Sequence, residues 1–231
     1  MRVLFVTSAL PHKTPFNSPE RRPPLGLGTL MSITRNSGHE VHFIDNYLKP
    51  SNFIEEGFLQ KNGIDYVGIS ANNICYRDTC RMLHKIEDLR ERGLWKGKII
   101  VGGPYVTISK NNLPEFVDHI VQGEGEEVIT DIIDGKLNER LIKTRRINDL
   151  DSLPFEPWDI FAKLPYDYTC PWIDVKPVFS MNTSRGCPGG CIFCSVGSVW
   201  GQEYTCFSAD RIVAEVEYLV RNFGVKGIYF R

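Results

Sequence analysis

The chain has 231 residues, of which 42% are hydrophobic and 24% are charged, a balance typical of globular proteins with one or two domains. Its net charge of −1 gives no electrostatic reason to expect nucleic acid or an anionic membrane as a partner. No apolar run reaches the length of a membrane span, and the N-terminus lacks a signal-peptide pattern. Seven cysteines without an export signal are typical of reduced thiols or metal ligands, so we expect a cytoplasmic protein.

Short apolar strands alternate with helices through the first 135 residues. β-Branched and aromatic runs predict strands at residues 2–8, 39–47, 66–70, 98–101 and 119–121. The spacing of apolar residues predicts helices at residues 25–36, 53–60, 78–92 and 126–133. Strands that are apolar on both faces are typical of a parallel sheet with helices on both sides. The sequence therefore predicts a doubly wound α/β domain over residues 1–140.

The loops that follow these strands are rich in glycine, serine and asparagine. They read Thr7-Ser8, Ser70-Ala71-Asn72, Gly102-Gly103 and Gly123-Glu124-Gly125. In doubly wound sheets, ligands bind at the carboxyl ends of the strands, near the point where strand order reverses. Glycine at this edge lets a bulky, flat ligand approach the backbone. Ordinary turn chemistry explains any one of these loops equally well.

A connector follows the first domain. We expect residues 141–177 to be a linker, because residues 147–165 are rich in proline and acidic side chains and lack a helical period. Trp158, Phe161 and Trp172 are expected to pack this connector onto one of the domains.

The second domain is predicted over residues 178–231. Residues 178–182 predict a strand, and residues 227–230 predict another. Between them, residues 208–223 predict an amphipathic helix, with Ser208 as its N-cap and Gly224 at its end.

Three cysteines follow the strand at residues 178–182. Cys187, Cys191 and Cys194 stand at C-x3-C-x2-C spacing, with glycines between them. Thiolates are soft ligands that suit zinc or iron–sulfur clusters. A structural zinc site needs four protein ligands, and no matching Cys or His pair lies downstream. Three ligands on a four-iron cluster would leave one iron open to a small molecule, whereas a zinc loop remains the alternative.

This cysteine loop resembles the signature C-x3-C-x-aromatic-C of the radical S-adenosylmethionine (SAM) enzymes, with Phe193 as the aromatic residue. The resemblance implies a [4Fe-4S] cluster on Cys187, Cys191 and Cys194, SAM on the open iron, and Phe193 beside the adenine. It also implies the start of a partial TIM barrel. Because the chain ends after the second expected barrel strand, we expect a truncated fragment that is inactive alone.

Residues 1–135 resemble the cobalamin-binding domain that precedes the radical SAM domain in one large subfamily. The matching motifs are Pro24-Leu25-Gly26-Leu27, Val101-Gly102-Gly103-Pro104 and Gly123-Glu124-Gly125-Glu126. The cobalamin contacts that the resemblance implies are Pro24, Leu25, Ser70, Gly102, Gly103, Gly123 and Glu124. The axial-histidine motif D-x-H-x-x-G is absent, which implies cobalamin with no histidine on cobalt. His12 stands in that loop, although a loop histidine without the motif more often faces solvent.

The combined resemblance implies an enzyme that uses a 5′-deoxyadenosyl radical and cobalamin to methylate an unactivated carbon of a small-molecule substrate. It also implies an external electron donor of the flavodoxin or ferredoxin type. The alternatives are a radical cyclase or rearrangement enzyme, a non-catalytic cobalamin-binding module, and a zinc-structured binding protein. Two cysteines, Cys75 and Cys80, are too few for a second cluster in the first domain. Cys170 and Cys206 are expected to be reduced thiols, with a ligand or substrate role as the alternative.

Overall fold

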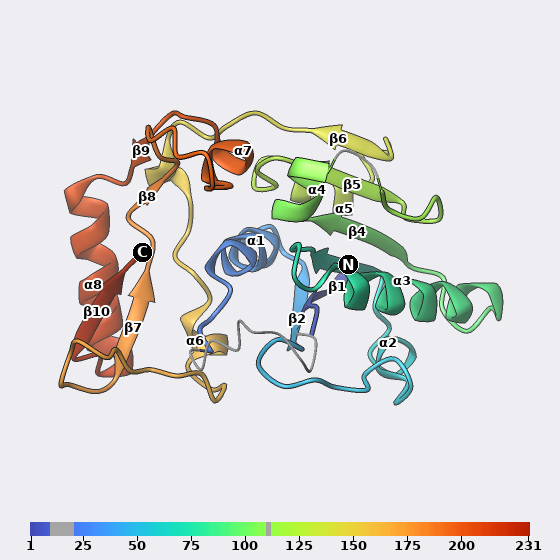
Figure 1. Ribbon diagram of the computed structural model, residues 1–231. Coiled ribbons are helices and arrows are strands. Elements are labelled where there is room, and N and C mark those ends of the chain that lie inside the picture. Colours follow the sequence, from blue (N-terminus) through green and yellow to red (C-terminus); the bar gives the residue numbers. More distant parts are fainter. Residues whose placement is uncertain (10–20, 110–111) are drawn as a thin grey trace. The chain divides into compact units, whose positions relative to one another are not determined.

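The computed structural model describes residues 1–9, 21–109 and 112–231 (Figure 1). The chain divides into two compact units. The first comprises Met1–Asn17 and Ile33–Arg146, and the second comprises Ser18–Ser32 and Ile147–Arg231. These bounds differ from the predicted domain limits at residues 140 and 178, because most of the expected linker packs within the second unit. No helix in the described ranges is long and apolar enough to cross a membrane.

A six-stranded parallel sheet forms the first unit and confirms the predicted α/β fold. Its strands are β1 (Arg2–Thr7), β2 (Glu40–Asp45), β3 (Tyr66–Ser70), β4 (Lys98–Gly102), β5 (His119–Gln122) and β6 (Leu141–Lys143). Their spatial order is β2-β1-β3-β4-β5-β6, and every neighbouring pair is parallel. The order reverses between β1 and β3, which is where doubly wound sheets bind ligands.

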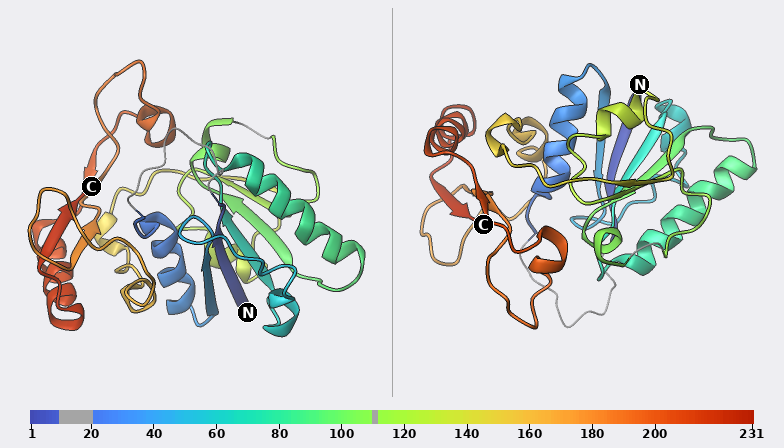
Figure 2. Two further views of the ribbon diagram at one scale, coloured as in Figure 1. Left: turned by 60° about the horizontal axis from the view of Figure 1, so that its bottom comes forward. Right: turned by 90° about the horizontal axis from the view of Figure 1, so that it is seen from above.

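Helices cover both faces of this sheet (Figure 2). On one face, Leu4 of β1 and Val67 of β3 share a buried cluster with Leu83 and Ile86 of α3 (Tyr76–Glu91). On the other face, the hydroxyl of Tyr66 donates to the carbonyl oxygen of Ile132 at 3.3 Å, and Ile132 belongs to α5 (Ile129–Ile133). Adjacent strand residues point to opposite faces, so Tyr66 and Val67 mark the two sides.

Three elements of the first unit differ from the sequence prediction. Helix α2 covers only Phe58–Lys61, because Gly57 adopts a left-handed conformation and the preceding residues form turns. Helix α4 (Pro104–Ser109), which is not among the predicted helices, begins at a proline that fits the first helical position. Strand β6, placed in the linker by the sequence, joins the sheet where Ile142 pairs with Val121.

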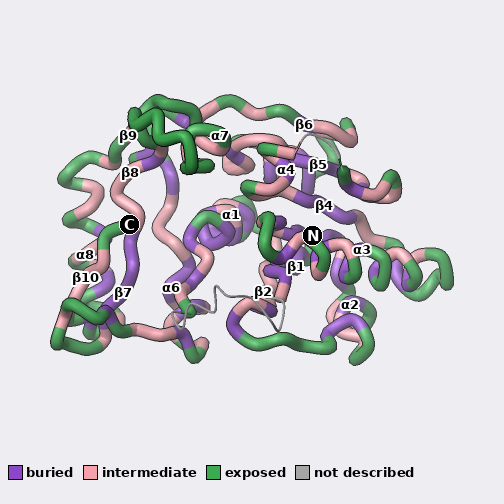
Figure 3. The backbone as a smooth tube through the Cα atoms, in the orientation of Figure 1, coloured by how far each residue is buried: buried purple, intermediate pink, exposed green. Residues whose placement is uncertain are grey.

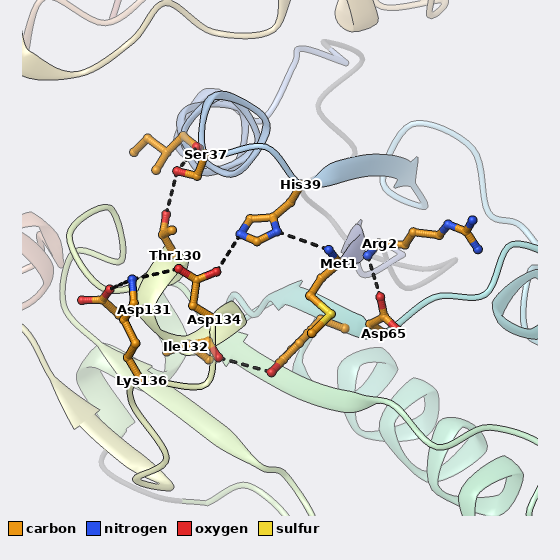
Figure 4. A network of polar contacts seen from close by, with 12 residues as sticks. Met1, Arg2, Ser37, His39, Asp65, Thr130, Asp131, Ile132, Asp134 and Lys136 are labelled. Atoms are coloured by element: carbon orange, nitrogen blue, oxygen red, sulfur yellow. Dashed lines mark hydrogen bonds and ion pairs between the residues drawn. The ribbon is translucent and has the colours of Figure 1, made fainter.

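A polar network joins the amino-terminal side of the sheet to α5 (Figure 4). The amino group of Met1 lies 3.4 Å from His39 Nδ1, and His39 Nε2 lies 3.2 Å from Asp134 Oδ1. Asp134 also pairs with Lys136 at 2.9 Å, and this hydrogen bond is the main cause that lowers the pKa of the Asp134 carboxyl. This network ties the first residue of the chain and the residue before β2 to the end of α5.

The second unit contains a βαβ motif that confirms the prediction for residues 178–231. Strands β7 (Val178–Met181) and β10 (Gly227–Phe230) pair in parallel, and α8 (Ala209–Phe223) connects them. Ser208 caps the helix, since its Oγ accepts from the backbone N–H of Arg211 at 3.1 Å. Gly224 ends the helix in a left-handed conformation with φ of 62°.

Two of the three predicted aromatic residues of the connector are buried in the second unit, and one of them stacks on β7. Trp158 and Phe161 bound α6 (Trp158–Phe161) and are fully buried, and the Trp158 ring stacks on Phe179 with centroids 4.9 Å apart. Trp172 is 78% exposed, so the expectation that it packs in the same way is wrong. Helix α1 (Leu25–Asn36) has the predicted bounds, and its Gly28 lies against Phe161.

Candidate functional site

The ends of β1 to β5 and the loops that follow them form what we call the carboxyl edge of the first unit. Thr7 is in register with Asp45 and with Ser70, and Ser70 is in register with Gly102. Thr7 Oγ1 donates to Asp45 Oδ1 at 2.5 Å, and the same carboxylate oxygen accepts from the backbone N–H of Tyr47 at 3.0 Å. The loops singled out in the sequence therefore leave the sheet side by side.

Gly103 fixes the contact between the loops after β3 and β4. The N–H of Ala71 donates to the carbonyl of Gly102 at 2.8 Å, and the N–H of Tyr105 donates to the carbonyl of Ala71 at 3.0 Å. Gly103 has φ of +99°, and an added Cβ would lie 2.8 Å from the Ala71 carbonyl oxygen. Glycine is therefore required at position 103 because the loops after β3 and β4 pack closely together. The sequence had suggested a different reason, the approach of a ligand to the backbone.

Gly123 fixes the loop after β5 in a similar way, and Glu124 is buried beside it. Gly123 has φ of +102°, and an added Cβ would lie 2.5 Å from Thr144 Oγ1. Its N–H donates to Thr107 Oγ1 at 3.2 Å. Glu124 is only 8% exposed and is the one ionisable residue among the predicted cobalamin contacts.

A stacked tyrosine pair, which the sequence analysis missed, lies beyond the ends of β3 and β4. The rings of Tyr76 and Tyr105 have centroids 4.0 Å apart and an interplanar angle of 22°. The hydroxyl of Tyr76 donates to the carbonyl of Asn112 at 2.5 Å. Burial raises the pKa of Tyr76, and the neighbouring Cys80 and Tyr105 raise it further. The sequence did carry a signal for this pair: a tyrosine follows shortly after the loop at the end of β3, and another follows shortly after the loop at the end of β4.

The cysteine loop, residues 186–195, lies in the second unit between two short strands. Strand β8 (Ser184–Arg185) pairs antiparallel with β9 (Thr205–Cys206), and α7 (Val196–Trp200) follows the loop. The Arg185 guanidinium lies 5.4 Å from the centroid of the Trp200 ring. The hairpin and this cation–π contact thus join the two ends of the loop.

The three predicted ligands in this loop are exposed thiols without disulfide bonds. An added Cβ at Gly189 would lie 3.4 Å from Cys187 Sγ and 3.8 Å from Cys191 Sγ, so two thiols flank one glycine. Among the described residues, no three His, Cys, Asp or Glu side chains are close enough together to hold a metal ion. Phe193 is 89% exposed. The donor set fits an iron–sulfur cluster chemically, although the thiols are not gathered around a common point.

The remaining predicted site residues are distributed over both units. Pro24 and Leu25 lie at the start of α1 in the second unit, where the Pro24 carbonyl accepts from Gly28 N–H at 2.9 Å. The roles predicted for the cobalamin contacts, for Phe193 and for the three cysteines remain predictions. His12 lies outside the described residues.

The other four thiols do not form a ligand group in the described part of the chain. Cys75 is buried at the start of α3, and this burial raises the pKa of its thiol. Cys170 is also buried, whereas Cys80 is half-buried and Cys206 is exposed.

Comparison with known proteins identifies relatives over nearly the whole chain. The B12 binding domain family matches residues 17–133. The chain is 28% identical to an uncharacterised methyltransferase of Pyrococcus horikoshii over 234 residues, covering 90% of this chain and 48% of that protein. It is 25% identical to the anaerobic magnesium-protoporphyrin IX monomethyl ester cyclase of Cereibacter sphaeroides, covering 88% of this chain and 36% of the cyclase.

A solved structure shares the fold. The cobalamin-dependent SAM radical enzyme OxsB, solved with aqua-cobalamin bound, matches with a TM-score of 0.75 and 20% sequence identity. The match covers 99% of this chain and 33% of OxsB. The chain thus spans a third to a half of the length of these relatives. It belongs to the B12 binding domain family and shares its fold with OxsB.

Proposed function

We propose that the protein is a cobalamin-dependent radical SAM methyltransferase that acts on an unactivated carbon of a small-molecule substrate. One observation carries the proposal: a single chain combines a B12 binding domain with the loop C-x3-C-x-F-C, which follows the buried strand β7 and the short strand β8. The methyltransferase name of the Pyrococcus relative supports methyl transfer as the reaction class.

The residues have separate tasks in this proposal. Cys187, Cys191 and Cys194 provide three thiolates for the cluster, and the exposed ring of Phe193 is free to lie against the adenine of SAM. When bound, the cluster supplies the electron that cleaves SAM, and cobalamin supplies the methyl group.

The carboxyl edge provides a preformed surface for cobalamin. Hydrogen bonds within the chain already fix the loops around Ala71 and Gly103, so binding does not have to order them. The protein's contribution to the reaction is to align the reacting groups and to keep water away from the radical. An external one-electron donor of the flavodoxin or ferredoxin type is part of the proposal.

Anaerobic reconstitution with iron, sulfide and hydroxocobalamin tests the two cofactor assignments separately. We expect stoichiometric iron and cobalt, the broad visible absorption of an iron–sulfur cluster, and a cobalamin spectrum without its lower base on cobalt. Iron without cobalt would remove the cobalamin assignment. Zinc in place of iron would overturn the radical SAM assignment and favour a zinc-structured binding protein.

A second reaction class is favoured by the cyclase among the relatives. In that case the radical would drive cyclisation or rearrangement, and cobalamin would not donate methyl. SAM with a labelled methyl group separates the two reactions: label in the product supports the methyltransferase, and unlabelled product contradicts it. Cobalt binding without SAM cleavage in the presence of a strong reductant would favour a non-catalytic cobalamin-binding module.

A further inference from the structure

A cleft of about 430 Å³ lies in the first unit beside the amino-terminal half of α3. One wall is the loop after β2, including Asn46 and Ser51, and the opposite wall is α3 itself. The buried side chains of Phe53, Ile54 and Met82 also line it. We call this feature the basic cleft. A volume of this size accommodates a small organic molecule.

Three cations project from one face of α3 into the lining of the basic cleft. Arg77, Arg81 and Lys85 follow one another at intervals of four residues, which places them on the same side of the helix. Lys85 forms an ion pair with Glu55. Arg77 and Arg81 make no hydrogen bond or ion pair within the part of the chain that the structure describes. Both arginines are also exposed, so the structure places two accessible guanidinium groups at the cleft.

The acidic residues of the basic cleft are already engaged. Glu55 pairs with Lys85, and that interaction is the main cause that lowers the pKa of the Glu55 carboxyl. Asp78 accepts a hydrogen bond from the backbone N–H of Ala9 at 2.7 Å. With three cations and two acids, the lining has an excess of one positive charge. Arg77 and Arg81 lie one helical turn apart on the same side of α3, and each guanidinium can donate two hydrogen bonds to a phosphate.

The loop wall of the basic cleft is held in place before any ligand binds. Asn46 is 5% exposed, and its Oδ1 accepts from Ser51 N at 3.0 Å and from Ser51 Oγ at 2.7 Å. Such preorganisation reduces the entropy that binding must overcome.

The basic cleft lies where the loops after β1 and β2 leave the carboxyl edge, and it shares no lining residue with the predicted cofactor contacts of the first unit. Ser70, Gly102, Gly103, Gly123 and Glu124 do not line it. Its cations come from α3, which covers one face of the sheet, and its apolar lining comes from the turns before α2 and from Met82 of α3.

We propose that the basic cleft binds an organic phosphate, with the phosphate on Arg77 and Arg81 and an apolar or aromatic body over Phe53, Ile54 and Met82. The two arginines account for the anion, and the apolar residues account for the preference for an organic group over inorganic phosphate. This site goes beyond the proposed methyl transfer and does not depend on it.

Calorimetric titration of the 231-residue chain with phenyl phosphate, inorganic phosphate and phenol tests the proposal. We expect phenyl phosphate to bind, and to bind more tightly than either of the other two. The double variant Arg77→Gln and Arg81→Gln should weaken binding by about tenfold or more, because charged hydrogen bonds are lost. The matched control removes two cations elsewhere on or near α3, by Arg92→Gln and Lys96→Gln, and should bind as the unchanged chain does.

Several results would overturn the proposal. Equal binding by the two double variants would show that Arg77 and Arg81 do not hold the anion. Equal affinity for phenyl phosphate and inorganic phosphate would rule out the apolar contacts. Binding of an acidic electron-carrier protein at Arg77 and Arg81, without phenyl phosphate binding, would make this face a protein docking surface instead. Far-ultraviolet circular dichroism confirms that the variants are folded, which is expected because both arginines are exposed.

Discussion

The carboxyl edge of the first unit and the cysteine loop of the second differ in how their shapes are fixed. At the carboxyl edge, strand register and backbone hydrogen bonds hold the loops in place, and side chains such as Thr7 and Asp45 add further bonds. In the cysteine loop, the three thiols are exposed and not gathered around a common point. Figure 3 shows this difference as mainly buried strands in the sheet against a largely exposed loop near β8 and β9.

This difference indicates two ways of building a cofactor site. A large, flat cofactor can bind to an edge that the polypeptide forms by itself. A metal cluster supplies strong bonds of its own, so the loop that holds it can take its final shape when the cluster binds. We therefore expect mutations at the carboxyl edge to change stability, and mutations in the cysteine loop to change metal content.

The largest expected effect is the loss of iron from a cysteine variant. Cys191→Ala should reduce the iron content of the reconstituted protein to near zero, because a cluster ligand is lost. The free energy of unfolding should change by no more than about 0.5 kcal/mol, because the thiol is exposed. Iron analysis and urea denaturation measure the two quantities. Cys206→Ala, also exposed, is the control and should retain iron; equal iron loss in both variants would contradict the assignment.

The second largest effect is the loss of stability when a glycine is replaced by alanine, which should be large at the carboxyl edge and small in the cysteine loop. Gly103→Ala should lower the free energy of unfolding by about 2–3 kcal/mol, because it combines positive φ with a clash against Ala71. Gly190→Ala in the cysteine loop has nothing within 4 Å of its added Cβ and should change stability by no more than about 0.5 kcal/mol. Urea denaturation followed by circular dichroism provides the test. Equal effects at the two positions would refute the contrast between the regions.

A smaller effect is expected at the packing between α1 and α6. Gly28→Ala should destabilise by about 1–3 kcal/mol, because its Cβ would lie 2.7 Å from the fully buried ring of Phe161. Gly26→Ala, on the same helix with open space around it, should stabilise by about 0.5–1 kcal/mol through helix propensity. Thermal unfolding of both variants measures the difference. A stabilising Gly28→Ala would show that Phe161 can move away.

The smallest effect concerns a carboxyl pair of the second unit. Burial raises the pKa of the Glu156 carboxyl, and the neighbouring Glu215 raises it further. The folded state therefore keeps this proton when the unfolded chain has lost it, so stability falls as the pH rises above about 4.3, the ordinary value for glutamate.

Glu156→Gln should remove this loss, because the amide carries no charge at any pH tested. At pH 7 the variant should be more stable by on the order of 1 kcal/mol, and near pH 4 the two proteins should be alike. Glu217→Gln, at an exposed ion pair with Arg221, is the control and should leave the pH profile nearly unchanged. A Glu156→Gln profile identical to that of the unchanged chain would show that Glu156 is already ionised.

Several elements could be predicted because their signals are local. Helix α1 has the predicted bounds, since Pro24 precedes its first residue and Gly38 follows shortly after its last. The cap of α8 by Ser208 and its end at Gly224 were predicted for the same reason. Strand β6 was missed because three residues carry no period, and only pairing with β5 makes them a strand.

The sequence by itself determined the alternation of strands and helices, the parallel sheet and the spacing of Cys187, Cys191 and Cys194. These depend on periodicity and on residue types close together in the chain. Only the tertiary structure decided that Trp172 is exposed while Trp158 is buried, and that Gly103 leaves room for the backbone of Ala71. It also decided that Arg77 and Arg81 line a cleft with no hydrogen bond or ion pair to the described residues. Each of these facts depends on which distant segment lies opposite a side chain, and composition and spacing carry no information about that.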